Sequence, residues 1–483
     1  MKKLKSFLFQ NRSTNQIIAK NTLWLSLSQV FRKIIKFALI IYAARVLGVN
    51  GYGVFSYAIG LAGFFTIFSD IGISGLLIRD FSAEGKISPE KLSTFLYIKF
   101  VLISASILLV LFVAPLFSNI PEAIPLISII AMLIAFDGFK DFTIAIMRSI
   151  ERMELEASVD ILTNLATLIF GLIALFTYKT SLSLAIAYAM GSGLGLLFSL
   201  FLLRRYFKQV WKYFNKHLAK KILVDAWPFA LIGIFGTIMV STDIVILGWL
   251  GDAESVGLYS AAIKPVQSMY VISSILSIST FPRISKFARN NIKEIRELLE
   301  KSISLLFLAG LPIVIGGIIL SKEIIETIYG SGYLSSTLTF QILLITIFAV
   351  FPMAMLFNVI IANNEQRRFI NPLALAAIGN IILNIALIPL YGIVGAAIAT
   401  VVTQFFAVAM IWIKIKKIIF FTVLPHVNKI FLSTMVMIIL TIIMKTLSIN
   451  FIMNIGLSAL AYFVLLSTLK EPLLKEVKQI TNR

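Results

Sequence analysis

The stretch from Ser28 to Gly48 reads SQVFRKIIKFALIIYAARVLG and combines the apolar content of a membrane-spanning helix with basic residues. Arg32, Lys33 and Lys36 lie inside it, spaced so that all three fall within about 140° of the helix circumference. A central Arg or Lys costs about 2.5–3.5 kcal/mol on membrane-insertion scales. We therefore expect this basic stripe to face protein or a water-filled cavity and the opposite Leu, Ile and Phe face to meet lipid.

Two structural interpretations of the stripe compete with a functional one. The helix could begin later and let the cations snorkel to the inner interface, but residues 37–47 alone are too few to cross a bilayer. The cations could instead form salt bridges with Asp70 or Asp137. In the functional interpretation, they line a cationic cavity that binds an anionic group of a substrate.

The composition is that of a multi-pass membrane protein. The 483 residues are 59% hydrophobic and 14% charged, whereas about 25% of the residues in a soluble domain are charged. There is no cysteine and only two histidines, which excludes disulfides and thiolate metal sites and disfavours a multi-histidine site. We expect a protein that is not an enzyme, with no catalytic residue, no metal and no cofactor.

Fourteen windows are apolar over about the 20 residues that a membrane span needs. They are residues 23–47, 55–78, 97–117, 124–146, 160–177, 181–203, 227–249, 257–281, 303–320, 338–361, 371–390, 393–413, 429–446 and 452–469. Only helices and closed barrels satisfy the backbone inside a bilayer, and these runs are longer than barrel strands. The sequence therefore predicts an all-α bundle of about fourteen transmembrane helices.

The basic residues predict the orientation. Of the 43 Lys and Arg residues, 33 fall in alternate loops starting with the N-terminus, and the opposite loops hold only Lys179, Lys322 and Lys445. Because Lys and Arg mark cytoplasmic loops, we expect both termini in the cytoplasm of a protein of the cell (plasma) membrane. The net charge of +20 then faces anionic lipid headgroups, and no nucleic-acid partner is expected.

The chain also repeats itself. LGVNGYGVFSYA at residues 47–58 corresponds to LGDAESVGLYSAA at residues 250–262, and polar segments after the fourth and tenth windows also correspond. Glycine-rich turns can look alike by chance, but parallel repeats of this kind occur in transporters whose halves rock about a central site. The predicted domains are an N-terminal lobe (1–203), a C-terminal lobe (204–415) and a C-terminal helix pair (416–483).

Carboxylates within the windows are the second group of candidates. Asp70, Asp137 and Asp243 could bind a coupling H⁺ or Na⁺, or could merely pair with the cations. Lys140 and Asp141 follow Asp137 at i+3 and i+4, so this group could neutralise itself within one helix.

Several motifs together resemble those of the polysaccharide-transport, Wzx-type flippases. They are AARVLGVNGYGVFSYA (43–58), SDIGISGLLIRD (69–80), DIVILGWLGDAESVGLYSAAIKP (243–265), FPRISK (281–286) and LIPLYGIVGAAIAT (387–400). That family belongs to the multidrug/oligosaccharidyl-lipid/polysaccharide exporter superfamily, with the MATE drug exporters and the lipid II flippases. The resemblance runs through nearly the whole chain.

The resemblance implies a MATE-like fold and a flippase that moves polyprenyl-(di)phosphate-linked oligosaccharides from the cytoplasmic to the outer leaflet by alternating access. Its partners would be that lipid-linked oligosaccharide and the membrane lipid. Relatives place basic side chains of the first and eighth helices in a central cavity, and Arg32, Lys36 and Lys264 match that description here. The alternatives are a MATE-like ion-coupled exporter of small molecules and an integral membrane polysaccharide polymerase or glycosyltransferase.

Overall fold

The structure, a computed structural model, is built of helices. It describes residues 14–85, 87–207, 213–287, 291–363, 365, 367–423, 428–471 and 473, and this part of the chain contains no β-strand. The predicted cytoplasmic ends of the chain lie largely outside the described residues, as do residues 208–212 of the predicted cytoplasmic loop 204–226. The all-α prediction is confirmed.

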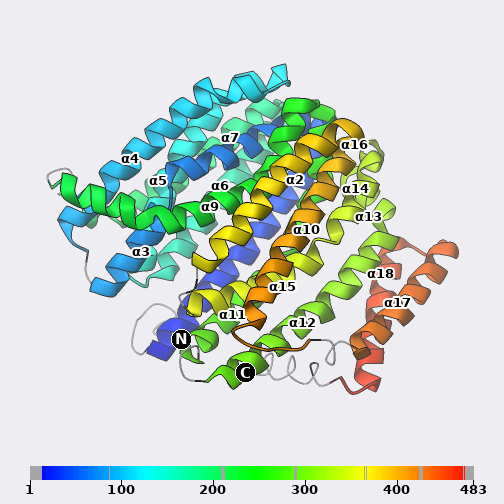
Figure 1. The fold of residues 1–483 in the computed structure, drawn as a ribbon. Coiled ribbons are helices and arrows are strands. Elements are labelled where there is room, and N and C mark those ends of the chain that lie inside the picture. The colour runs from blue at the N-terminus through cyan, green and yellow to red at the C-terminus, as the bar shows by residue number, and fades with distance from the viewer. Residues whose placement is uncertain are drawn as a thin grey trace, which may run out of the picture. The chain divides into compact units, whose positions relative to one another are not determined.

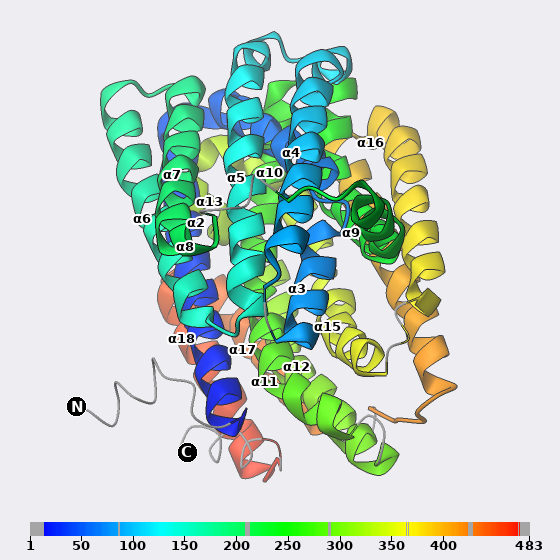
Figure 2. The ribbon, with the colours of Figure 1, turned by 90° about the vertical axis from the view of Figure 1, so that its left-hand side faces the viewer.

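Figure 1 and Figure 2 together label the main helices. They are α2 (Thr14–Thr66), α3 (Ile73–Glu84), α4 (Pro89–Phe112), α5 (Ile127–Ser149), α6 (Met153–Thr177), α7 (Ser181–Leu202), α8 (Arg204–Phe207), α9 (Lys216–Leu250), α10 (Ala253–Met269), α11 (Val271–Phe287), α12 (Ile292–Ile319), α13 (Ser321–Tyr329), α14 (Thr337–Leu344), α15 (Ile347–Ala362), α16 (Arg367–Lys416), α17 (Asn428–Thr446) and α18 (Phe451–Thr468). Short 3₁₀ turns join some of them: η1 (Ile67–Ser69), η2 (Ala114–Phe117), η3 (Pro121–Leu126) and η5 (Ser331–Ser336).

Eleven helices in the described ranges are long and apolar enough to cross a membrane, or twelve if the bent pair Ser331–Leu344 and Ile347–Ala362 is one span. Two of the eleven are 47 and 48 residues long, about 70 Å at 1.5 Å per residue against a hydrocarbon core of about 30 Å. Each is broken at a glycine. Gly48 has φ 68° and Gly392 has φ 55°, a backbone region that glycine enters without steric cost. Both breaks fall between predicted windows, and the count of fourteen spans stays a prediction.

Clustering of contacts divides the chain into two compact units. The first unit comprises residues 1–260 with 373–396, and the second comprises residues 261–372 with 397–483. The lobes predicted from the internal repeat have other boundaries and stay a prediction. Each unit is described by itself below.

In the first unit, α4, α5, α6 and α7 pack side by side (Figure 2), and α2 packs on α5, α6, α7 and α9. The two faces of helix α6 show why it packs on one side only. Its exposed Leu165, Ile169 and Ile173 form one apolar face, while Asp160 and Asn164 on the other face are buried. This distribution suits a helix with lipid on one side and polar protein on the other.

The predicted window at residues 55–78 differs from the structure. Residues 55–78 do not form one helix, because α2 ends at Thr66, η1 follows, and the chain turns before α3 begins at Ile73. Asp70 therefore lies in a break between helices. Its carboxylate accepts a hydrogen bond from the backbone N–H of Ser74 (3.1 Å), so it satisfies a free donor in the first turn of α3.

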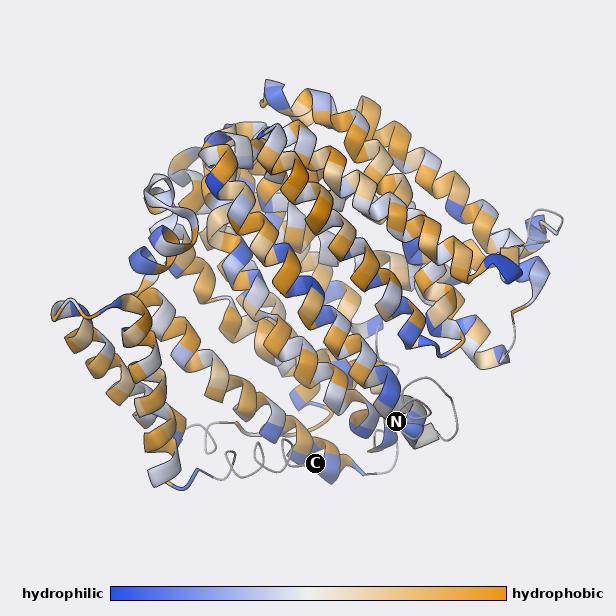
Figure 3. Ribbon diagram, turned by 180° about the vertical axis from the view of Figure 1, so that it is seen from behind, coloured by the Kyte–Doolittle hydropathy of each residue, from blue (hydrophilic) through white to orange (hydrophobic). Residues whose placement is uncertain are grey.

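In the second unit, α12 contacts several other helices. Helices α11 and α12 pack on α15, and α12 also packs on α17, which pairs with α18. The hydroxyl of buried Tyr462 donates to the carbonyl oxygen of Leu308 (2.8 Å) and ties α18 to α12. Figure 3 shows hydrophobic residues along most of the helix lengths, as expected for segments that meet lipid.

Candidate functional site

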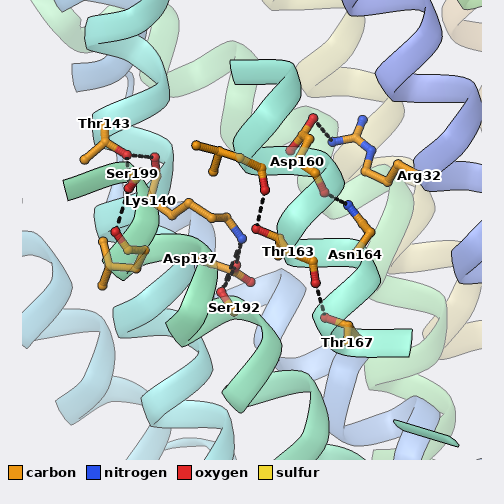
Figure 4. Close-up of polar contacts among 12 residues, drawn as sticks. Arg32, Asp137, Lys140, Thr143, Asp160, Thr163, Asn164, Thr167, Ser192 and Ser199 are labelled. Atoms are coloured by element: carbon orange, nitrogen blue, oxygen red, sulfur yellow. Dashed lines mark hydrogen bonds and ion pairs between the residues drawn. The ribbon is translucent and has the colours of Figure 1, made fainter. Parts of the chain in front are cut away.

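The first unit contains a cavity of about 680 Å³ between membrane helices. Side chains of α2, α3, α5, α6, α7 and α9 line it. A cavity of this size lies in the range of ligand sites, about 300–1,000 Å³. Figure 4 shows its polar wall, with α5, α6 and α7 opposite the Arg32 side chain of α2.

The cavity brings together four of the predicted site residues. These are Arg32, Lys36, Asp70 and Asp137. Lys33 and Asp243 are not among the lining residues. Lys264 belongs to the second unit, on α10 just before Pro265. The shared aqueous space predicted for Lys264, Arg32 and Lys36 stays a prediction.

The polar wall holds two ion pairs. The Lys140 ammonium lies 2.5 Å from an Asp137 carboxylate oxygen and donates to the Ser192 hydroxyl at 3.2 Å. Asp137 and Lys140 thus form the pair that their i, i+3 spacing allows within α5. The Arg32 guanidinium lies 3.6 Å from the Asp160 carboxylate, so its partner is neither Asp70 nor Asp137. Pairing within the protein offsets part of the cost of removing these charges from water.

Two further ion pairs include residues that line the cavity. The buried Lys99 ammonium lies 2.6 Å from the Asp70 carboxylate. At the other end of α5, Arg148 donates to both oxygens of Glu156, at 2.8 and 2.6 Å. A two-pronged contact of this kind is the strong form of an Arg–carboxylate pair, and it fixes the end of α5 against the start of α6.

Two charged residues that line the cavity have no ion-pair partner among the described residues. Lys36 and Asp141 are both exposed to the cavity. Neither has an ion pair within 4.0 Å or a hydrogen bond to any residue in the described ranges. One cation and one carboxylate are therefore left for a ligand.

Asp243 lies in a separate buried network on α9, which we call the Asp243 network. The Tyr259 hydroxyl donates to its carboxylate at 2.6 Å, and the amides of Asn384 and Asn380 donate at 2.8 and 3.4 Å. All four side chains are at least 97% buried. The amide oxygen of Asn384 is buried without a hydrogen-bond partner among the described residues, which is costly unless another group satisfies it.

Some charged residues of the cavity are absent from the sequence prediction. Asp160, Arg148 and Glu156 line the cavity, and Lys99 pairs with the lining residue Asp70. Their contacts depend on helix packing. Asp160 carries a signal in the sequence, because Thr163, Asn164 and Thr167 follow it at i+3, i+4 and i+7 and extend one polar face within an apolar span. Among the described residues, no group of three or more His, Asp or Glu side chains could hold a metal ion.

Comparisons with known proteins agree with this architecture. A Shigella flexneri protein named as an O-antigen transporter is 26% identical over 333 residues, 65% of this chain and 78% of that protein. A Haloferax volcanii protein named as a probable low-salt glycan biosynthesis flippase, Agl15, is 25% identical over 79% of this chain and 80% of its own length.

The fold is shared with solved transporters. The lipid II flippase MurJ in an inward closed conformation superposes with a TM-score of 0.79 at 18% identity, covering 94% of this chain and 99% of that chain. The MATE multidrug transporter DinF-BH superposes with a TM-score of 0.61 at 13% identity, covering 85% and 98%. The fold class is thereby confirmed as that of a MurJ- and MATE-like multi-pass membrane protein.

Family models cover most of the chain. The MatE model matches residues 228–390. The model of the polysaccharide biosynthesis protein family matches residues 18–288, more than half of the sequence, and includes all of the residues that line the cavity. The chain therefore belongs to the polysaccharide biosynthesis protein family.

Proposed function

We propose that this protein is a flippase that moves polyprenyl-(di)phosphate-linked oligosaccharides from the cytoplasmic to the outer leaflet by alternating access. The observation that carries the proposal is the polar cavity between membrane helices in the region that matches the family. Relatives named as flippases and an O-antigen transporter support it. No covalent bond changes in this process, so the proposed protein is not an enzyme.

Lys36 and Arg32 would receive the phosphate. Lys36 is exposed to the cavity and has no ion-pair partner within 4.0 Å in the described part of the chain. Arg32 keeps 37% of its side chain exposed, and its contact with Asp160 is long at 3.6 Å. A phosphate oxygen can form shorter, charge-assisted hydrogen bonds with the same guanidinium. Arg32 could therefore exchange its carboxylate partner for the phosphate, while the polyprenyl tail stays in lipid.

Lys33 and Lys264 complete the proposed cationic path. The two side chains are half-buried, and a cation inside the membrane normally marks a pathway or a partner. The chain has no cysteine, so single cysteines at Arg32, Lys36 and Lys264 give a clean test. Membrane-impermeant thiol reagents should reach all three positions if they share one aqueous space, and protection of Lys264→Cys alone would exclude it from the path.

The proposed orientation has both termini in the cytoplasm of a plasma-membrane protein, with lobes at 1–203 and 204–415. The distribution of basic residues supports it. Reporter fusions after Lys221 and Arg483 should score cytoplasmic, and a fusion after Gly251 should score external. An external signal at Lys221 would invert the scheme.

Ion coupling is assigned to the Asp243 network. Asp70 and Asp137 each have a lysine within 2.6 Å, which favours a structural role as charge partners. Asp243 receives hydrogen bonds from a phenol and two amides, one of which is the amide of Asn384, whose oxygen is buried without a hydrogen-bond partner among the described residues. Buried carboxylates in transporters bind H⁺ or Na⁺, and oxygen ligands suit hard cations.

The MATE-like exporter is the second candidate, because the MatE model matches residues 228–390 and MATE structures share the fold. A transport assay in proteoliposomes distinguishes the flippase from the MATE-like exporter. A polyprenyl-diphosphate-linked oligosaccharide with a fluorescent sugar should change leaflet, as read by an impermeant quencher, while a cationic dye should not move. Dye transport without movement of the lipid-linked sugar would overturn the flippase proposal.

A further inference from the structure

The cavity in the first unit holds charges of both signs in nearly equal number. Its lining contains four cations and five carboxylates. The cations are Arg32, Lys36, Lys140 and Arg148, and the carboxylates are Asp70, Asp137, Asp141, Glu156 and Asp160. Three of the four cations lie within 3.6 Å of a carboxylate. A ligand therefore meets one uncommitted cation, Lys36.

Most of the serine and threonine hydroxyls that line the cavity already donate their proton within the protein. Thr66, Thr163 and Thr167 each donate to a carbonyl oxygen of the preceding turn of their own helix, at 2.5–2.8 Å, as Ser and Thr in helices commonly do. Ser69 donates in the same way to Thr66, at 2.7 Å, and Ser192 donates to Asp137, at 2.5 Å. A hydroxyl has one proton, so these groups offer a ligand only their oxygen lone pairs.

The acceptors, in contrast, remain available. Asp141 is exposed to the cavity and has no hydrogen bond or ion pair within the described ranges. The Asp137 side chain is 35% exposed even though it pairs with Lys140. An ionised carboxylate is acceptor-only. The wall that α5 presents to the cavity therefore suits a ligand that donates hydrogen bonds.

We infer that the cavity selects glycans that present hydroxyl or ammonium donors near the phosphate and rejects glycans that carry a carboxylate there. This inference rests on the proposed flippase function. The phosphate binds Lys36, which is the uncommitted cation. Sugar hydroxyls or an amino group then donate to Asp141 and Asp137. A uronic acid in the same place would bring a second anion opposite Asp141, and like charges at close range cost several kcal/mol.

The test uses three polyprenyl-diphosphate trisaccharides that differ only in the second sugar: glucose, glucosamine with a free amine, or glucuronic acid. The wild-type protein in proteoliposomes should flip the first two and flip the glucuronic acid substrate at least about tenfold more slowly, which corresponds to about 1.4 kcal/mol. Asp141→Asn keeps the volume and removes the anion. Asp141→Asn should reduce the difference in flipping rate between the glucose and glucuronic acid substrates to about threefold or less. It should also slow flipping of the glucosamine substrate.

Asp225→Asn is the matched control, because Asp225 on α9 also has no ion pair among the described residues and does not line the cavity. It should leave the order of the three substrates unchanged. Equal rates for all three substrates in the wild type would overturn the inference and leave the flippase proposal intact. Selectivity that Asp141→Asn does not relax would remove Asp141 from the inference. If none of the three substrates changes leaflet, both proposals are overturned. The comparison of the three substrates uses the wild-type protein, so it does not depend on the folding of a variant.

Discussion

Two buried polar clusters of the first unit, the cavity and the Asp243 network, use carboxylates in different ways. In the cavity, Asp137 and Asp160 lie within 3.6 Å of a lysine or an arginine. In the Asp243 network, the donors to the carboxylate include the Tyr259 hydroxyl and the amides of Asn384 and Asn380. The first arrangement neutralises charge, whereas these three donors orient the carboxylate without adding charge.

The difference assigns each cluster a separate task. An ion pair can open and let a substrate phosphate replace the carboxylate, as proposed for Arg32 and Asp160. In the Asp243 network, the buried amide oxygen of Asn384 belongs to an amide that already contacts the carboxylate, and we propose that these oxygens together bind a small cation. Breaking a pair should therefore affect folding, removing the uncommitted cation should affect transport, and neutralising Asp243 should affect coupling.

Lys140→Ala should have the largest effect, on stability. It leaves Asp137 without its ammonium partner, and breaking a buried pair costs about 3–5 kcal/mol. We expect about 3 kcal/mol, the lower end, because 35% of the Asp137 side chain is exposed. Thermal unfolding of the detergent-purified protein measures it. The double variant Asp137→Asn with Lys140→Met should recover most of the loss, and the exposed Lys220→Ala should change little. Equal stability of Lys140→Ala and wild type would show that the pair is not structural.

Lys36→Ala should have the largest effect on transport. Losing one charge-assisted hydrogen bond to phosphate costs about 1.5–3 kcal/mol, so flipping should fall about 10- to 160-fold at 1.36 kcal/mol per factor of ten. The amount of folded protein in the membrane should not fall, because no ion pair is broken. Lys36→Arg should retain most activity. The exposed Arg205→Ala on α8 is the control, and normal flipping by Lys36→Ala would remove Lys36 from the phosphate site.

The sequence predicted which face of α2 is polar, but it did not predict which residues pair with the charges on that face. Arg32 and Lys36 line a cavity as expected from the cost of cations in lipid, and the helix breaks at Gly48 and Gly392 fall where the windows end. The pairing of Arg32 with Asp160 depends on the packing of α2 against α6. Periodicity within one helix carries no information about that contact, so a pattern of cations could not reveal how many of them were already neutralised.

Asp243→Asn should have an intermediate effect, confined to coupling. The substitution keeps the size of the side chain and removes the charge that would bind H⁺ or Na⁺. We expect transport driven by an ion gradient to fall about tenfold, a loss of about 1.4 kcal/mol. Flipping without a gradient should change little. Paired assays with imposed pH or Na⁺ gradients measure this, and Asp70→Asn should not reproduce it because Asp70 is paired with Lys99. Unchanged gradient dependence would contradict the assignment.

The smallest effect should come from a carboxylate outside both clusters. Asp252 is exposed at the start of α10 and accepts a hydrogen bond from the backbone N–H of Ser255 at 2.8 Å, which holds the pKa of its carboxyl below its usual range. The cap should therefore stabilise the fold at neutral pH, and the stabilisation should be lost as pH falls through that lowered pKa. Asp252→Ala should cost about 0.5–1 kcal/mol at pH 7.

Asp252→Asn should retain the cap and lose its pH dependence, since Asn caps helices without ionising. Unfolding curves at pH 7 and at acidic pH measure both, and an equal pH response of wild type and Asp252→Asn would show that this carboxylate contributes nothing to acid sensitivity.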